Sequence, residues 1–109
     1  GVGTASDGRA VAWNLVEGVN DPPTNSERAI WVGGTPSEPP PVHFRGMDGI
    51  DLAGADRLDF VTESTHARDE NFLLFSSRYR HRFGTFTGSL AGLELTEGFG
   101  VMEQHDAVW

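Results

Sequence analysis

Short runs of alternating apolar and polar residues, broken by glycine and proline, recur along the whole chain. Alternation with a period of two is typical of strands with one buried face, and no long segment has the 3.6-residue period of a helix. With 14 Gly and 6 Pro in 109 residues, turns should be frequent. The pattern predicts an all-β antiparallel meander of about seven or eight strands, forming a barrel or part of one. The expected strands are 9–17, 28–32, 42–45, 58–67, 72–83, 85–90 and 93–107.

Glycine pairs and proline runs mark the expected turns and loops. Gly33-Gly34 and Ala91-Gly92 predict two-residue hairpin turns, because glycine adopts positive φ without steric cost. Residues 20–26 and the prolines at 39–41 are expected in loops, since proline cannot donate a hydrogen bond to a strand ladder.

The beginning of the chain predicts an incomplete first strand. Ser6-Asp7-Gly8 has the composition of a hairpin turn, yet only GVGTA precedes it. We therefore expect residues 1–109 to be one C-terminal domain of a longer two-domain protein. The unpaired edge of its first strand should then be covered by the N-terminal half or by a second copy.

The composition excludes several functions. The absence of cysteine rules out disulfides, thiolate catalysis and cysteine-ligated metal sites. Sixteen Asp and Glu against eight Arg give a net charge of −8, which disfavours nucleic-acid binding and favours a neutral, apolar or cationic ligand. No apolar run approaches the roughly 20 residues that span a bilayer, and no signal peptide is recognisable, so a cytoplasmic location without a membrane span is expected.

One predicted hairpin can be tested against its own charge pattern. If residues 68–71 form its loop, Phe60 lies opposite Tyr79 on the core face and Asp59 lies opposite Arg80 on the other face. The separation of apolar and polar residues between the two faces and the pairing of opposite charges select the same register. We therefore expect strands 58–67 and 72–83 to pair in this way.

The last strand carries Glu103 and His105 among apolar neighbours, and two registers are open for it. An uninterrupted pairing from the Ala91-Gly92 turn places Arg80 opposite Glu103 at the surface. A bulge at Gly84 or within residues 98–100 instead places Tyr79 opposite Glu103 on the concave face.

The second register suggests acid/base chemistry. A buried Glu103 could act as general acid or base, with His105 or Tyr79 as its partner. The alternative is a structural hydrogen-bond cluster or an exposed pair. The ligand types of His81, His105 and Glu103 would suit a metal ion, but strand spacing alone is no metal motif, and we predict neither a metal nor a cofactor.

Three segments resemble a known bacterial family. GRAVAWNLVEGVND with SERAIWV, ARDENFLLFSSRYRHRFGTFTGSL, and LELTEGFGVMEQHDAVW are similar to the C-terminal part of the family labelled domain of unknown function 2804. The sequence departs from that family at His81 and Arg82, where Gln-Pro is usual, so His81 is not treated as a catalytic residue of the family. The residues that match most closely are Trp13, Asn14, Glu17, Tyr79, Glu103, His105 and Trp109.

That family is distantly similar to two-domain lipocalin-like proteins, which include carotenoid hydratases. The resemblance implies a calycin-type barrel, the second of two, with an apolar ligand between or within the domains. We therefore expect a domain that binds a hydrophobic small molecule, together with an N-terminal half or a second copy. A hydratase, isomerase or cyclase using Glu103, and a purely structural or interaction domain, are the alternatives. The candidate ligand-binding residues are Trp13, Asn14, Glu17, Phe60, Phe75, His81 and Trp109.

Overall fold

The computed structural model describes residues 1–18, 24, 26–64 and 78–106, with the backbone alone at 64, 78–81 and 104–106. These residues form a single antiparallel sheet and no helix, which confirms the predicted all-β class, with nine strands instead of seven or eight. The strands are β1 (Val2–Ala5), β2 (Ala10–Asn14), β3 (Ala29–Val32), β4 (Thr35–Ser37), β5 (His43–Phe44), β6 (Gly49–Asp51), β7 (Arg57–Ser64), β8 (Arg78–Leu90) and β9 (Leu93–Asp106).

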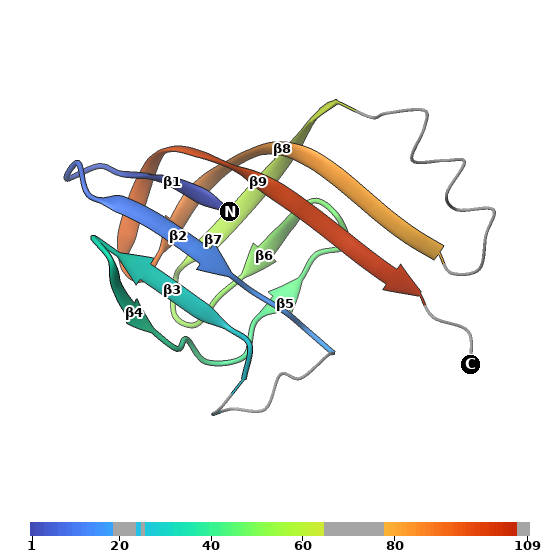
Figure 1. Ribbon diagram of the computed structural model, residues 1–109, viewed down its shortest axis with the longest axis horizontal. Helices are drawn as coiled ribbons and strands as arrows, with labels where there is room; N and C mark the ends of the chain where they lie inside the picture. Colours follow the sequence, from blue (N-terminus) through green and yellow to red (C-terminus); the bar gives the residue numbers. More distant parts are fainter. Residues whose placement is uncertain (19–23, 25, 65–77, 107–109) are drawn as a thin grey trace.

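The sheet has the strand order β4-β3-β2-β1-β9-β8-β7-β6-β5. Strands that are consecutive in the sequence are neighbours everywhere except at β4 and β5, which form the two edges. The first and last strands pair with each other, so the curled sheet has the order of an up-and-down barrel opened between β4 and β5 (Figure 1). This arrangement is consistent with the expected lipocalin-like barrel.

The predicted turns are confirmed, and the two missed strands are short. Gly33-Gly34 joins β3 to β4, and Ala91-Gly92 joins β8 to β9 with both residues at positive φ. The strand β4 was not predicted because it contains Pro36, which argues against a central strand. Proline is accepted in an edge strand, and β4 forms one edge of the sheet. The other missed strand, β6, is only three residues long.

The predicted register of the hairpin with a loop at 68–71 is wrong, although the loop itself lies outside the described residues. Phe60 pairs with Phe86 and Asp59 with Thr87, seven residues further along β8 than Tyr79 and Arg80. The expected ion pair between Asp59 and Arg80 is therefore replaced by other contacts of Asp59.

The first strand is not an open edge of the sheet. Val2–Ala5 pairs with β2 on one side and with β9 on the other. The Gly1 amine also donates a hydrogen bond of 2.8 Å to the Trp13 carbonyl oxygen. The expectation that this strand leaves an unpaired edge is thus wrong for Val2–Ala5.

A bulge does occur in the β8–β9 ribbon, but not at either predicted place. Between the pairs Ser89–Glu94 and Thr85–Phe99, β9 advances five residues while β8 advances four. The pairing with β1 shifts between Leu95 and Glu97 on the same strand. The extra residue therefore lies on β9 near Thr96, and beyond it the even-numbered positions of β9 face the core.

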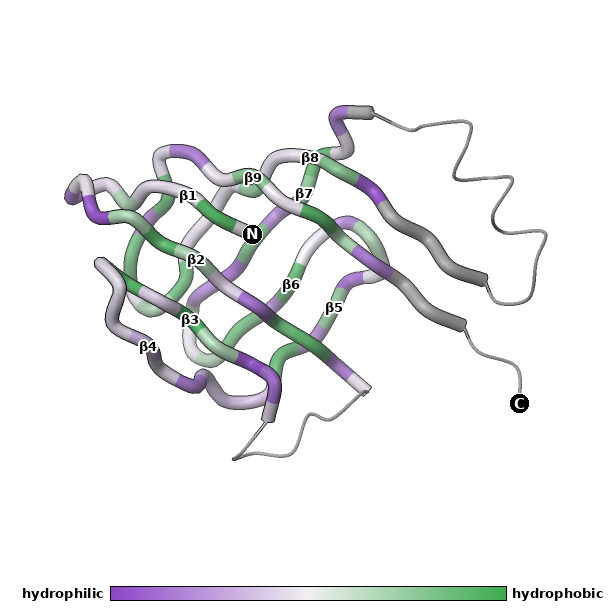
Figure 2. The backbone as a smooth tube through the Cα atoms, viewed as in Figure 1, coloured by the Kyte–Doolittle hydropathy of each residue, from purple (hydrophilic) through white to green (hydrophobic). Residues whose placement is uncertain are grey.

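Aromatic rings fill the inside of the curl. The Trp13 and Phe86 rings meet edge to face at 5.3 Å, and the Phe60 and Phe86 centroids lie 4.8 Å apart. A Cβ at Gly84 would overlap the Val61 carbonyl oxygen and crowd the Phe60 ring, so glycine is required there for close packing. Apolar and polar residues alternate along the strands (Figure 2). The buried apolar residues are Ala5, Val11, Trp13, Ile30, Val42, Met47, Ile50, Leu58, Phe60, Phe86, Leu90, Leu95 and Met102.

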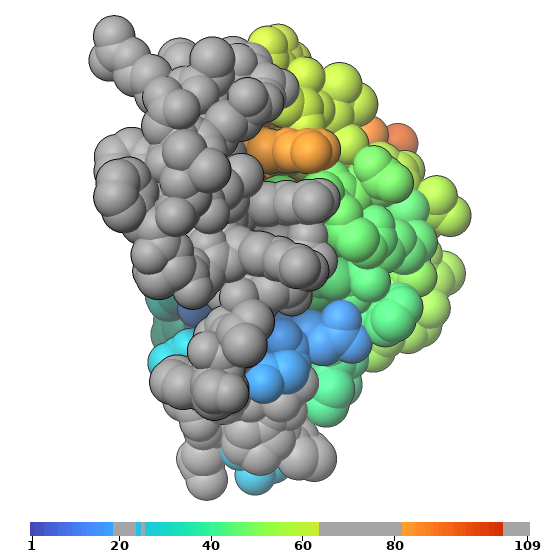
Figure 3. Space-filling model, turned by 90° about the vertical axis from the view of Figure 1, so that its right-hand side faces the viewer, coloured from blue at the N-terminus to red at the C-terminus, as the bar shows by residue number. Residues whose placement is uncertain are grey.

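Two side chains near the opening of the curl join strands to neighbouring segments. Glu17, just beyond β2, accepts a hydrogen bond of 2.9 Å from the Phe44 backbone and contacts His43 Nδ1 at 3.1 Å. In the space-filling view the chain after β2, in light blue, lies against the green residues of the β5–β7 region (Figure 3). Nearby, the buried Arg28 donates from Nε to the Pro39 carbonyl oxygen. These bonds join the end of β2 to the edge strand β5, and the residue before β3 to the segment that follows β4.

An ion network stabilises the other face near β6 and β7. Asp59 accepts hydrogen bonds from Arg57 and Arg45, and Arg45 also contacts Asp51 at 2.9 Å. The hydrogen bond from Arg57 and then that from Arg45 lower the pKa of Asp59 below 3.8.

We expect the contribution of Asp59 to stability to depend on pH. Because its folded-state pKa is lowered, the stabilisation is present above pH 3.8 and is lost as the pH falls through the folded value. Urea unfolding of Asp59→Asn should therefore show a lower midpoint than the unmodified chain at pH 7 and an equal one near pH 2. The exposed Asp48 makes no ion pair within the described residues, so Asp48→Asn is the control, and an equal loss in both variants would contradict the network.

Candidate functional site

The aromatic residues expected to line an internal ligand site are part of the packed core. Trp13 is 5% exposed and Phe60 is 6% exposed, and both contact Phe86. Space for an internal ligand would require these rings to move apart. The sequence pattern placed both side chains on the inner face correctly, and there each ring packs against Phe86.

Asn14 and Glu17 have contacts that hold strands together. Asn14 is exposed, and its side-chain amide donates a hydrogen bond of 2.8 Å to the Glu27 carbonyl oxygen. Glu17 joins the end of β2 to β5 through Phe44 and His43. Both residues therefore have a structural role at the ends of strands.

Glu103 lies on the outer face of the sheet. Its neighbour Met102 is 2% exposed, while Glu103 itself is exposed. Because adjacent strand residues point to opposite faces, the core lies on the side of Met102 and Glu103 points away from it. Glu103 pairs with His81, so both predicted registers, opposite Arg80 or opposite Tyr79, are wrong. The exposed Glu103 also lacks the burial that the acid/base interpretation requires.

The backbone register does bring the other candidate positions close to Glu103. Tyr79 pairs with His105, next to the pair of His81 and Glu103 on the same two strands. The side chains of Tyr79, His81 and His105 are not described. Phe75 and Trp109, the remaining candidates for ligand binding, lie outside the described residues.

Exposed apolar side chains form a continuous band across the outer face, which we call the outer stripe. Val61 is paired with Thr85, Thr85 with Phe99, and Phe99 with Val2. In the next row Phe83 pairs with Val101. The outer stripe comprises Val2 (57% exposed), Val61 (59%), Phe83 (46%) and Phe99 (51%), with Val101 half-buried between them.

The row of the outer stripe continues toward the edge of the sheet. Val2 pairs with Ala12, and Ala12 pairs with Trp31 on β3, which is 38% exposed. Large apolar residues thus occur at the same level of the outer face on β3, β1, β9 and β7. Scattered exposed apolar residues are normal in proteins, whereas a contiguous band marks an interaction site.

Carboxylates flank the outer stripe along the strands. Glu97 precedes Phe99 by two residues on β9, and Glu103 follows Val101 by two on the same strand. Glu63, beyond Val61 on β7, accepts a hydrogen bond of 3.3 Å from Thr85, as Glu97 does at 3.5 Å from Thr4. Neither Glu63 nor Glu97 forms an ion pair within the described part of the chain.

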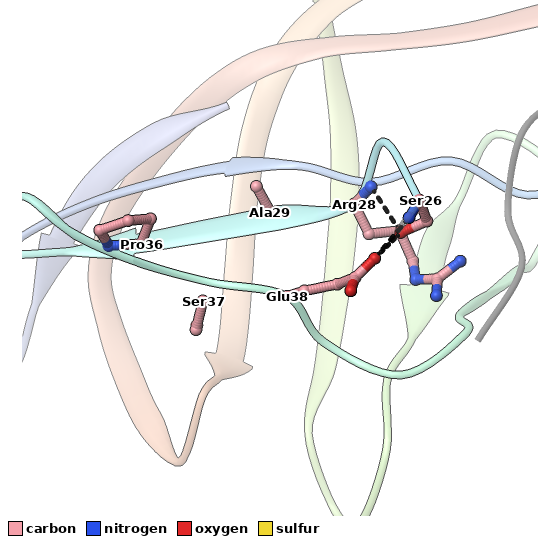
Figure 4. Close-up of a pocket in the computed structure, with 6 residues that line it drawn as sticks. All are labelled: Ser26, Arg28, Ala29, Pro36, Ser37 and Glu38. Atoms are coloured by element: carbon pink, nitrogen blue, oxygen red, sulfur yellow. Dashed lines mark hydrogen bonds between the residues drawn. The ribbon is translucent and has the colours of Figure 1, made fainter. Parts of the chain in front are cut away.

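A shallow depression of about 360 Å³ lies elsewhere, along β3 and β4 (Figure 4). On its floor Glu38 accepts hydrogen bonds of 2.6 Å from both the backbone nitrogen and the hydroxyl of Ser26. These bonds fix the loop before β3 against the strand β4. None of the candidate residues from the sequence lines this depression, and its Glu38 carboxylate, Ser26 hydroxyl and Arg28 Nε are engaged in local bonds. Its lining residues are Ser26, Arg28, Ala29, Pro36, Ser37 and Glu38.

The residues of the outer stripe were not among the candidates from sequence, although a signal existed. Phe83 is odd-numbered while Phe86 and Leu90 are even-numbered, and this change of parity was interpreted as a bulge at Gly84 or within residues 98–100. The strand β8 instead continues through Gly84, so that Phe83 faces outward while Phe86 and Leu90 face the core. A change of parity between large apolar residues therefore indicated an exposed ring.

Comparison with known proteins gives no relative: no family model matches the chain, and no curated protein and no solved structure matches it significantly. Among the described residues, no three acidic or histidine side chains gather to hold a metal ion. The described residues also contain no helix that is long and apolar enough to cross a membrane.

Proposed function

We propose that this chain is a lipocalin-like β domain that acts by binding, and that it takes apolar groups on the outer stripe. The observation that carries the proposal is the continuity of Val2, Phe99, Val61 and Phe83 across four paired strands of the outer face. The three rings packed inside the curl leave the outer face as the better place for a ligand. The resemblance to the domain of unknown function 2804 supports an apolar ligand, since the proteins distantly similar to that family act on polyenes.

The outer stripe can contact a hydrophobic small molecule on one side, and a second surface above it would strengthen the binding. Small-molecule sites are concave and cover most of the ligand, whereas one face of a sheet covers a single side. An N-terminal half of a longer protein, or another chain, would supply that cover. The proposal is therefore a binding domain that shares its site with a second body, and it assigns no reaction to Glu103.

Binding of Nile red, a neutral dye whose emission rises in apolar surroundings, tests this proposal. We expect the unmodified chain to enhance the emission and the double variant Phe83→Ser/Phe99→Ser to lose most of the enhancement, because both rings are about half exposed. Thermal unfolding should show that the variant remains folded. The exposed Thr87 lies on β8 outside the outer stripe, so Thr87→Ser is the control and should bind the dye normally.

Two outcomes would overturn the proposal. The first is a folded, unmodified chain that leaves the dye emission unchanged. The second is a double variant that remains folded and binds the dye as strongly as the unmodified chain, since the dye site would then lie away from Phe83 and Phe99.

A further inference from the structure

The apolar residues of the outer stripe and its flanking carboxylates together define the chemistry of what would cover it. Along β9 the outward positions are occupied in turn by Glu97, Phe99, Val101 and Glu103. An apolar centre is thus bordered at both ends by negative charge, and Glu63 adds a third carboxylate beside Thr85. A matching surface has apolar side chains in its centre and positive charge at its rim.

The net charge of the whole chain also favours a cationic partner. With 16 acidic residues against 8 Arg the net charge is −8, so the molecule attracts cationic partners at long range. It repels anionic surfaces for the same reason. Within the described residues, Arg9 forms an ion pair with Asp7, Arg45 and Arg57 form ion pairs around Asp59, and no ion pair includes Glu63 or Glu97.

A second copy of the chain fits the outer stripe poorly. In a symmetric dimer the same patch meets itself, so Glu63, Glu97 and Glu103 would approach their own counterparts. The area is also small: even with a full side-chain area of about 250 Å² for each residue, the exposed parts of Val2, Val61, Phe83 and Phe99 present at most about 530 Å². A stable interface buries about 800 Å² on each partner. Charge and area both favour a smaller, basic partner segment.

We infer that the outer stripe docks a cationic amphipathic segment of a partner protein, with apolar side chains over Phe83 and Phe99 and Lys or Arg beside Glu63, Glu97 and Glu103. This inference rests on the proposed function, because it names the occupant of the same surface. The apolar contact supplies most of the affinity. The carboxylates select the charge of the partner and raise the association rate.

Two synthetic peptides with identical Leu positions, one with Lys and one with Glu at all polar positions, test the inference. We expect the Lys peptide to bind in a fluorescence anisotropy titration, and the Glu peptide to bind at least about tenfold more weakly. The double variant Phe83→Ser/Phe99→Ser should lower the affinity for the Lys peptide by about tenfold or more at any salt concentration.

The role of charge is tested with two variants of equal net charge. Glu63→Gln/Glu97→Gln removes two carboxylates beside the outer stripe, whereas Glu27→Gln/Asp48→Asn removes two exposed ones away from it. The first variant should bind the Lys peptide with lower affinity than the second variant does. Its binding should also depend less on salt concentration. An equal effect of both would mean nonspecific attraction to an acidic protein and would overturn the inference.

The outcomes separate this inference from the proposed function. If Nile red binds at Phe83 and Phe99 but both peptides bind equally or not at all, the outer stripe is an apolar site without a cationic partner, and only the inference fails. If the dye does not bind, the proposed function fails as well. Preferential binding of the Glu peptide would contradict the charge argument directly.

Discussion

Replacing Phe86 by alanine should destabilise the fold more than any other single truncation in the core. The ring is 1% exposed and contacts both Trp13 and Phe60, so its removal leaves a cavity between strands from both halves of the sheet. Truncation of a buried Phe costs about 3–5 kcal/mol. Urea unfolding followed by tryptophan fluorescence should show this loss, because Trp13 reports on the same cluster.

Phe83 provides a matched control on the same strand, three residues away. It is 46% exposed on the outer face, and Phe83→Ala should cost less than about 1 kcal/mol. Equal losses at positions 83 and 86 would contradict the assignment of the two faces of β8. The comparison therefore tests the fold and the exposure of the outer stripe in one experiment.

Gly88→Ala should have the second largest effect, through the backbone. Gly88 has a φ of 123°, a conformation that other residues rarely adopt, and a Cβ there would overlap the Arg57 carbonyl oxygen on β7. Backbone strain of about 1–3 kcal/mol would add to a similar cost of overpacking. We expect a loss of roughly 3 kcal/mol in the same urea experiment.

Gly92 separates the two causes. It also has positive φ, at 74°, but nothing lies near the place of its Cβ. Gly92→Ala should therefore show the conformational cost alone, about 1–2 kcal/mol. A loss at Gly92 equal to that at Gly88 would mean that the close approach of β8 to β7 contributes nothing.

The local elements of the fold could be predicted from the sequence because their determinants are local. Gly33-Gly34 and Ala91-Gly92 specify tight hairpins through φ alone, and both are turns in the structure. The alternation in Ala10–Asn14 placed Val11 and Trp13 inside and Asn14 outside, as observed. Such features depend on residues within one strand or turn.

The register of the long strands could not be predicted because it depends on distant parts of the chain. Pairing Asp59 with Arg80 satisfied both charge and polarity between two strands considered alone. The structure instead pairs Phe60 with Phe86, where Trp13 from β2 packs on the same ring. Exposed opposite charges contribute little, so the burial of a third aromatic residue decides the register.

The candidate site failed for a related reason. The sequence left two registers open for Glu103: one placed it outside opposite Arg80, and the other placed it inside if a bulge lay at Gly84 or in residues 98–100. The bulge near Thr96 shifts the pairing by one residue in the opposite sense, which brings His81 opposite Glu103. The sign of such a shift depends on which strand holds the extra residue, and composition alone does not reveal that.

The pairing of the first strand with the last one determines how the chain must fold. The β1–β2 hairpin is local and can form early, but Val2 meets its other partner, Phe99, across almost the whole sequence. Contacts of such long range slow folding, because the loop entropy is lost before the contact forms. During synthesis the free side of β1 must wait for β9, and an unpaired strand edge is prone to aggregation in that interval. The emergence of β9, and not that of the early hairpins, is therefore the event that allows this sheet to close.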